Sequence, residues 1–230
     1  MKPPSCWILV FVWAWSLQQM LVPAEEQRQG RLSCPASSRC GNVTISYPFW
    51  LTDSQTGRSC GPLDFEVDCS DNGTTPLLWS SGLDGFEILA IAYEERSLRV
   101  LDLAKLKLLK DDGSCHVPRW NTSNMLGRAF RINPVNLNLV FYNCTTASHN
   151  PALVQMRCEN RSSVFVRVGG YYEGYSVEGC DATVVPVQGS SSSGESNASD
   201  YVQLISDGFL VTWEDPSSLE VRGKLFIHQN

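Results

Sequence analysis

Residues 40–49 read Cys40-Gly41-Asn42-Val43-Thr44-Ile45-Ser46-Tyr47-Pro48-Phe49 and stand within a series of closely spaced cysteines. Cys34 precedes them, and Cys60-Gly61-Pro62 and Phe65-Glu66-Val67-Asp68-Cys69 follow. In the last of these stretches Phe65 and Val67 alternate with acidic residues, which predicts a β-strand. Cysteines at this density predict a small β module that is held together by disulfide bonds.

A secretory leader is predicted over residues 1–24. It contains the basic Lys2, an apolar run over residues 6–17 and the small outer residues of Val22-Pro23-Ala24. The run is shorter than the roughly 20 residues that span a bilayer. We predict cleavage before Glu25, with an uncleaved anchor as the alternative.

Removal of the leader reduces the nine cysteines to eight, because Cys6 is lost. An even number in an oxidising compartment predicts four disulfide bonds, although eight cysteines permit 105 pairings. We expect no metal site, since the chain has no CxxC pair and its three histidines are isolated from one another. The predicted disulfide cysteines are Cys34, Cys40, Cys60, Cys69, Cys115, Cys144, Cys158 and Cys180.

Six sequons predict an N-linked glycoprotein, whose glycans must project into solvent. The middle residue of the sequon at Asn143 is itself a cysteine. The predicted acceptors are Asn42, Asn72, Asn121, Asn143, Asn160 and Asn197.

The chain of 230 residues is acidic, and its formal net charge of −6 becomes −7 once Lys2 is removed. Such a surface argues against nucleic acid as a partner. After residue 24 no apolar stretch approaches membrane-spanning length, so we expect a secreted product without a membrane span.

The predicted fold class is mainly β: small disulfide-rich extracellular modules with one or two short helices. A hairpin is predicted over residues 86–102, and residues 103–109 alternate Leu with Lys as either an edge strand or a short helix. A helix over residues 200–206 would have Asp200 as N-cap and Gly208 near C′. Further strands are predicted at 137–142, 164–168 and 183–187.

Two modules are predicted, separated near residue 110. An N-terminal segment at 25–33 precedes the first module, and a divergent tail follows the second. The modules comprise residues 34–109 and 110–213, the second with a serine-rich spacer at 188–199, and the tail comprises 214–230.

Cys40-Gly41, Ile45-Ser46-Tyr47-Pro48-Phe49, Cys60-Gly61 and Phe65-Glu66-Val67-Asp68-Cys69 resemble the galacturonan-binding module of plant wall-associated receptor kinases. Downstream, the chain resembles the ectodomains of leaf rust resistance receptor-like kinases. That part of the resemblance rests on Val140-Phe141-Tyr142-Asn143-Cys144-Thr145, Cys158, Cys180, Val184-Val185-Pro186-Val187 and Gly208-Phe209-Leu210-Val211-Thr212-Trp213.

The resemblance implies a non-enzymatic protein of the cell wall that binds polysaccharide, with pectin or oligogalacturonide as ligand. Full-length relatives would be plasma-membrane receptors, whereas residues 214–230 lack the expected cysteines and membrane segment. We therefore expect a kinase-less form. The alternative function is a soluble module or decoy that pairs with receptor-like kinase ectodomains or with a peptide in defence signalling.

No catalytic residues are predicted. Glu66 with Asp64 or Asp68 offers the two carboxylates of a glycosidase, but their alternation fits a solvated strand face better. A nucleophile elbow of the Gly-x-Ser-x-Gly type is absent from the sequence, and His116 stands in a loop-like context.

Sugar binding requires aromatic planes for ring faces and cationic groups for carboxylates. Core packing is the competing role for each aromatic residue, and Tyr47 and Phe49 are assigned to packing. No cofactor is expected, although calcium could bridge an acidic protein and pectin. The candidate ligand-binding residues are Trp50, Arg119, Arg128, Arg131, Tyr171, Tyr172 and Tyr175.

Overall fold

The structure, a computed structural model, describes residues 34–52, 59–70, 73–78, 85–110, 116–146, 150–156, 163–170, 174–189 and 197–216. The chain divides into two compact units, Met1–Pro35 and Ala36–Asn230. All elements below belong to the second unit. The predictions that fall outside the described residues concern the leader, the segment 25–33, most of the tail, Cys115, Cys158, Asn72, Asn160, Tyr171 and Tyr172.

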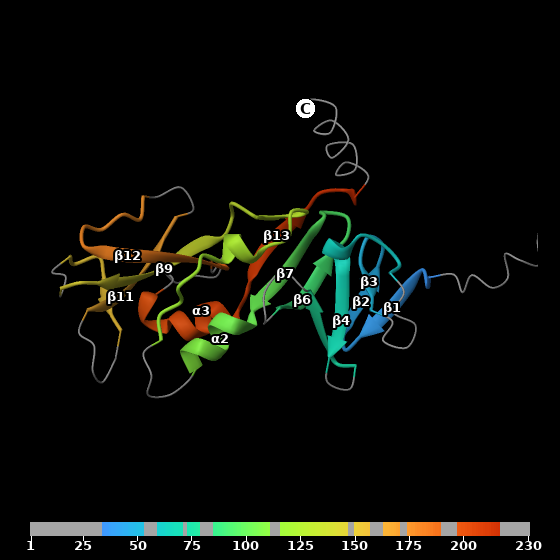
Figure 1. Cartoon of the computed structure of the whole chain (residues 1–230), viewed down its shortest axis with the longest axis horizontal. Helices are drawn as coiled ribbons and strands as arrows, with labels where there is room; N and C mark the ends of the chain where they lie inside the picture. The colour runs from blue at the N-terminus through green and yellow to red at the C-terminus, as the bar shows by residue number, and fades with distance from the viewer. Residues whose placement is uncertain are drawn as a thin grey trace, which may run out of the picture. The chain divides into compact units, whose positions relative to one another are not determined.

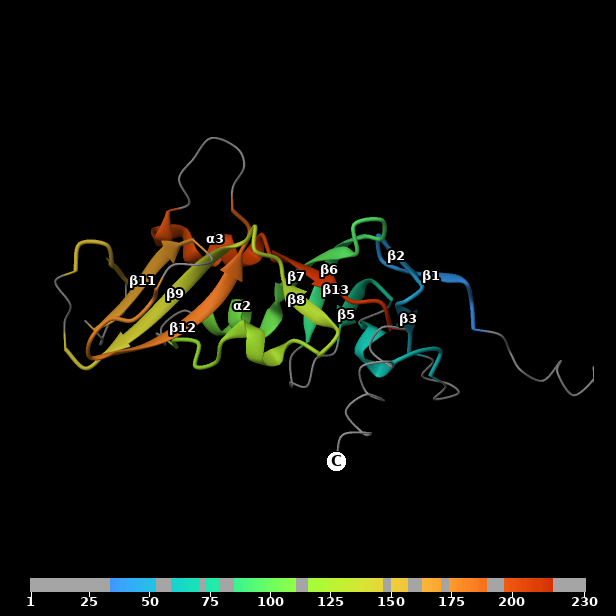
Figure 2. The same cartoon turned by 90° about the horizontal axis from the view of Figure 1, so that it is seen from above.

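The described strands form three sheets, which confirms the predicted mainly β class (Figure 1). A hairpin pairs β1 (Ser37–Cys40) with β2 (Val43–Ser46). A four-stranded sheet has the order β10-β11-β9-β12, with strands Val154–Gln155, Val164–Gly169, Leu137–Cys144 and Cys180–Val187 (Figure 2). A seven-stranded sheet has the order β3-β4-β5-β6-β7-β13-β8, with strands Trp50–Leu51, Glu66–Ser70, Thr75–Leu78, Phe86–Ala92, Ser97–Asp102, Phe209–Trp213 and Phe130–Ile132.

The predicted hairpin over residues 86–102 is confirmed as β6 and β7, which pair Ala92 with Ser97 and Phe86 with Asp102. Strand β13 extends this hairpin, because Val211 pairs with Leu98, and β8 then pairs with β13. Strands from both predicted cysteine-rich segments therefore belong to one sheet.

Aromatic side chains fill the core of the seven-stranded sheet. The ring of Phe49 lies 5.4 Å from that of Phe65 and 5.0 Å from that of Trp213, both in edge-to-face contact. Phe130 packs against Phe49 and Phe65. This clustering buries a large apolar area in a small domain.

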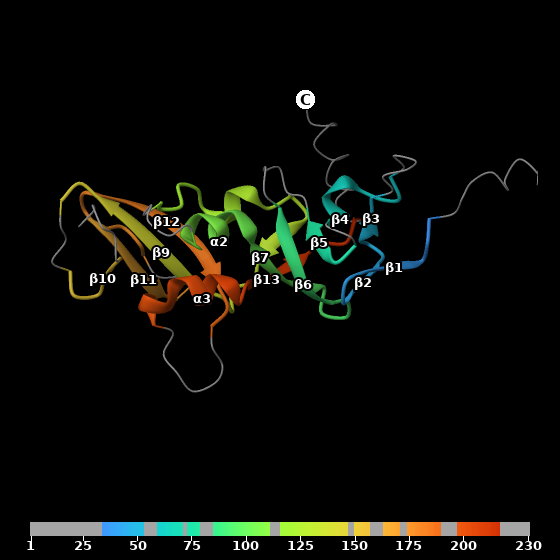
Figure 3. The same cartoon turned by 90° about the horizontal axis from the view of Figure 1, so that it is seen from below.

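Residues 103–109 form a helix, α2 (Leu103–Lys110), and the predicted second helix is α3 (Tyr201–Ser206). Asp200 is the N-cap of α3 but makes no side-chain capping bond, and Gly208 ends the helix with a positive φ of 74°. Both helices pack on the four-stranded sheet and share a core that includes Leu106, Ile205 and Phe141 (Figure 3). No helix in the described part of the chain is long and apolar enough to cross a membrane.

Two disulfide bonds join strands. Cys40 at the end of β1 is bonded to Cys69 in β4, and Cys144 in β9 is bonded to Cys180, its register partner in β12. Cys34 and Cys60 are also disulfide-bonded. The Cys40–Cys69 bond therefore holds the β1–β2 hairpin to the seven-stranded sheet, and the Cys144–Cys180 bond links β9 and β12 at one end of the four-stranded sheet.

Candidate functional site

Trp50 is a core residue. Its side chain is 8% exposed, and its indole N–H donates a hydrogen bond to the carbonyl oxygen of Pro62 over 3.1 Å. A sugar ring stacks on an indole only where one face is open to solvent. Trp50 therefore offers no such face, and neither does Trp213 in the same core.

Tyr47 is 70% exposed, so its assignment to packing is wrong, whereas Phe49 is buried as predicted. The physical reason is the turn that follows β2, in which the amide of Phe49 donates to the carbonyl of Ser46 over 2.9 Å. This turn directs Phe49 into the core and leaves Tyr47 outside it.

The β1–β2 hairpin, which Tyr47 directly follows, presents a cationic side chain close to its turn. Arg39 pairs with Thr44 in register, so their side chains share a face, and both are exposed. Tyr93 anchors the hairpin, because its hydroxyl donates to the carbonyl of Thr44 and accepts from the amide of Ser46. Burial raises the pKa of Tyr93, and the hydrogen bond from Ser46 offsets this only in part.

Arg128 and Arg131 lie close together, Arg128 just before β8 and Arg131 within it. The Arg131 guanidinium donates to the carbonyl oxygens of Arg128 and Phe130, each over 2.8 Å, and lies 3.7 Å from the carboxylate of Glu214. Much of its hydrogen-bonding capacity is used within the protein. Arg119 is exposed and, together with residues of β12, lines a groove.

Tyr175 packs over one face of the four-stranded sheet, against a cluster that includes Tyr142 and Phe165. Its hydroxyl donates to the carbonyl of Gly170 and accepts from the side-chain amide of Asn138. Tyr175 is therefore held by packing and hydrogen bonds, and its side chain is half-exposed.

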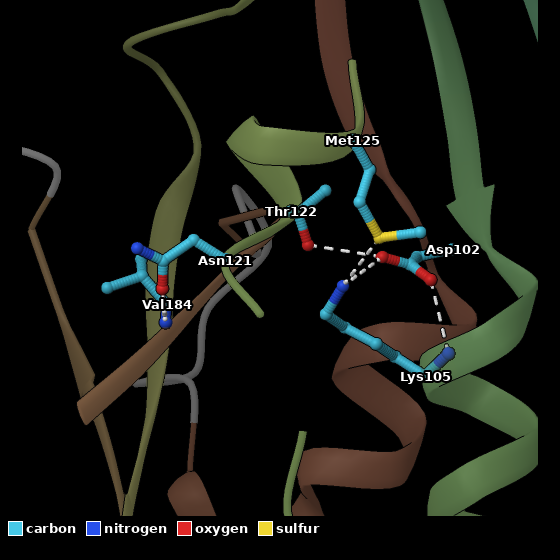
Figure 4. Close-up of polar contacts among 6 residues, drawn as sticks. All are labelled: Asp102, Lys105, Asn121, Thr122, Met125 and Val184. Carbon is cyan, nitrogen blue, oxygen red and sulfur yellow. Dashed lines mark hydrogen bonds and ion pairs between the residues drawn. The ribbon is translucent and has the colours of Figure 1, made fainter. Parts of the chain in front are cut away.

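A buried polar cluster joins α2 to the 3-10 turn η3 (Thr122–Met125), as Figure 4 shows. The Asp102 carboxylate accepts from the Lys105 amide over 3.1 Å, from its ammonium group over 2.6 Å and from the Thr122 hydroxyl over 3.1 Å. Asp102 and Lys105 are 2% and 4% exposed. Both charges are paired and hydrogen-bonded, which burial requires.

The neighbouring residue Asn121 makes a second link, since its side-chain oxygen accepts from the amide of Val184 in β12 over 2.8 Å (Figure 4). Asn121 and Thr122 together tie β12 to the end of β7. Asn121 and Thr122 are here called the clamp. The clamp holds the C-terminal end of residues 116–120 beside β12.

Residues 116–119 form one wall of a groove of about 630 Å³. The other residues that line it lie at the end of β9 and along β12, and the full lining is His116, Val117, Pro118, Arg119, Asn143, Asp181, Ala182 and Thr183. Trp120 follows directly and is 69% exposed. Within the described residues, no group of three or more His, Cys, Asp or Glu side chains is placed to hold a metal.

Residues 34–102 match the protein family described as wall-associated receptor kinase galacturonan-binding. The match covers less than half of the chain. The family resemblance seen in the sequence is thereby confirmed. Tyr47, Arg39 and Thr44 lie within the matched segment, whereas the groove lies outside it.

Three similar proteins come from Arabidopsis thaliana and are named as leaf rust 10 disease-resistance locus receptor-like protein kinase-like proteins. The relative whose name ends in kinase-like 2.8 is 30% identical over 125 residues, which are 54% of this chain and 13% of the relative. The relative whose name ends in kinase-like 1.2 is 27% identical over 191 residues, which are 79% of this chain and 28% of the relative. The chain therefore spans less than a third of the length of these relatives, and no solved structure matches it.

Sequence reasoning missed Arg39, Tyr47 and Asp181. The signal for the first two was local, because Cys40-Gly41-Asn42 is a turn sequence that places Arg39 opposite Thr44. The position of Asp181 against residues 116–119 had no local signal, since those segments are more than 60 residues apart.

Proposed function

We propose that the chain is a secreted, non-enzymatic receptor-type ectodomain that binds acidic cell-wall polysaccharide, with pectic galacturonan as its ligand. The observation that carries this function is the match of residues 34–102 to the galacturonan-binding family. Within that domain, the exposed ring of Tyr47 and the exposed guanidinium of Arg39 lie on one hairpin.

Tyr47 supplies a flat apolar plane for a pyranose ring, and Arg39 supplies the forked donor that suits a uronate carboxylate. Thr44 adds a hydroxyl on the same face as Arg39. The ligand would therefore contact side chains that the core does not use.

A glycan at Asn42 would affect the two ends of this binding surface differently. Asn42 occupies the turn of the hairpin, whereas Tyr47 follows the last residue of β2 at the opposite end. Four strand residues lie between them, a span of about 13 Å at roughly 3.3 Å per residue. Arg39, by contrast, is in the second residue pair from that turn, so a glycan at Asn42 would lie closer to Arg39 than to Tyr47.

The net charge of the chain opposes a polyanion at long range, so binding depends on the local Arg39 contact or on calcium. Salt would screen an Arg39–uronate contact, and affinity for oligogalacturonide should fall as ionic strength rises.

The test is a calorimetric titration of the secreted chain, from Glu25 onward, with defined oligogalacturonides in calcium and in chelator. We expect saturable binding that Tyr47→Ala and Arg39→Ala each weaken about tenfold, the effect of losing one charge-assisted or stacking contact. Lys107→Ala is the matched control, because it removes one exposed positive charge outside the domain.

Folded, fully oxidised protein that binds no oligogalacturonide at millimolar concentration, with or without calcium, would exclude this function. Receptor ectodomains or peptides would then be the partners to test.

A further inference from the structure

We propose that the groove between residues 116–119 and strands β9 and β12 is a second saccharide site, which holds a pyranose ring. It lies outside the galacturonan-binding domain, so it does not depend on the ligand proposed for that domain.

The lining combines hydrogen-bond donors and acceptors in the way that a ring with several hydroxyls requires. Arg119 donates, Asp181 accepts, and Asn143 and Thr183 can do both. Val117, Pro118 and Ala182 supply apolar surface between them. The lining is mainly polar, as a hydroxyl-rich ligand requires, and the volume of the groove lies within the range of about 300 to 1,000 Å³ of small-ligand sites.

Register brings the polar groups of the sheet together. Asp181 and Asn143 are directly opposite in β12 and β9, so their side chains leave the same face of the sheet, and both are exposed. Thr183 is two residues along β12 on that face and is buried at the floor.

The opposite wall is held in place before any ligand arrives. Asn121 binds the Val184 amide and Thr122 binds the Asp102 carboxylate, so the clamp fixes the chain one residue after Trp120. The indole of Trp120 is 69% exposed beside Arg119 in sequence and is available to cover a sugar face. A preformed wall lowers the entropy cost of binding.

Two sources can supply the pyranose. Asn143 belongs to the sequon Asn143-Cys144-Thr145, so an N-glycan attached there would begin on the groove wall. A free wall oligosaccharide is the other source, and it can enter only where Asn143 carries no glycan.

The experiment uses the full secreted chain and a Thr145→Ala variant, which removes the sequon but keeps Asn143. Glycopeptide mass spectrometry first measures the occupancy of Asn143. Chitobiose, which reproduces the stem of an N-glycan, and trigalacturonate are then titrated into the Thr145→Ala protein, with Trp fluorescence as readout.

We expect saturable binding of at least one of the two probes, weakened about tenfold or more by Arg119→Ala and by Asp181→Ala. Lys107→Ala is the matched control, because it removes one exposed positive charge outside the groove. An occupied Asn143 together with chitobiose binding assigns the site to the chain's own glycan, and trigalacturonate binding to an unoccupied site assigns it to wall saccharide.

The groove is not a saccharide site if the folded Thr145→Ala protein binds neither probe at millimolar concentration, or if binding is indifferent to both Arg119→Ala and Asp181→Ala. Loss of binding in Tyr47→Ala alone would point to the galacturonan-binding domain and not to the groove. Failure of one site is thus distinguishable from failure of the other.

Discussion

The hydroxyl of Thr122 donates a hydrogen bond to the buried carboxylate of Asp102 over 3.1 Å. Asp102 ends β7 of the seven-stranded sheet, while the residue before Thr122 binds β12 of the four-stranded sheet. Together with the bond between Asn121 and Val184, it therefore connects the two sheets through a charged acceptor that is shielded from water.

Thr122→Val removes the donor and keeps the shape of the side chain. Because the acceptor is a buried carboxylate, we expect the free energy of unfolding to fall by about 1.5 to 3 kcal/mol. Urea unfolding with the disulfides intact measures the change. Thr122→Val retains the sequon Asn121-Thr122-Ser123, and Asn124→Ala, at an exposed residue of η3 outside the sequon, should change stability little.

Lys105→Met removes the cation that neutralises Asp102. We expect a loss of about 3 to 5 kcal/mol, because the carboxylate would stay buried without a counter-charge. The double variant Asp102→Asn/Lys105→Met should be more stable than Lys105→Met, since Asn is also a good helix cap and needs no counter-charge. Equal stability of the single and double variants would show that the pair is not coupled.

The strands were predictable because their patterns are local. Alternation over 86–102 and β-branched runs at 164–168 and 183–187 correspond to β6, β7, β11 and β12. Sheet membership was not predictable, since β13 pairs with β7 across more than 100 residues and no short motif encodes that choice.

The groove was not predictable for the same reason, because it depends on contacts between residues that are far apart in the sequence. The sequence identified Arg119 and the sequon at Asn143, but their common groove depends on the clamp, which joins residues from β7, η3 and β12. Lys105 resembled a surface lysine in a Leu-Lys alternation. Its burial follows from the ion pair with Asp102, three residues earlier, and from the non-local contact with Met125.

Tyr142→Phe should leave the protein equally stable or more stable by about 1 kcal/mol at neutral pH. The Tyr142 hydroxyl is buried and has no hydrogen-bond partner in the described structure, so its removal relieves a desolvation cost. Tyr175→Phe is the contrasting variant and should destabilise by about 1 kcal/mol, because its hydroxyl bonds both Gly170 and Asn138. Thermal unfolding of both proteins checks the difference.

Alkaline pH tests the same hydroxyl. Burial raises the pKa of Tyr142 above its ordinary value of 10.0, an effect that Arg167 opposes and Tyr175 reinforces. The unfolded chain then releases its proton first as pH rises through 10, so the stability of the native protein falls above that pH. In Tyr142→Phe the fall should be shallower, and an unchanged slope in unfolding experiments would argue against a raised pKa.

Gly41→Ala should disrupt the hairpin that carries Arg39 and the Tyr47 turn. Gly41 has a φ of 55°, and a β-carbon there would lie 2.1 Å from the carbonyl oxygen of Thr74, a backbone atom that cannot move aside cheaply. The left-handed conformation alone costs an alanine about 1 to 2 kcal/mol, and the clash adds to it. We expect reduced secretion or a clearly lowered unfolding midpoint, together with weaker binding of oligogalacturonide by the protein that folds. Gly174→Ala is the control, because a β-carbon at Gly174 meets no atom within 4 Å, and a comparable loss there would show that the effect is not specific to the hairpin.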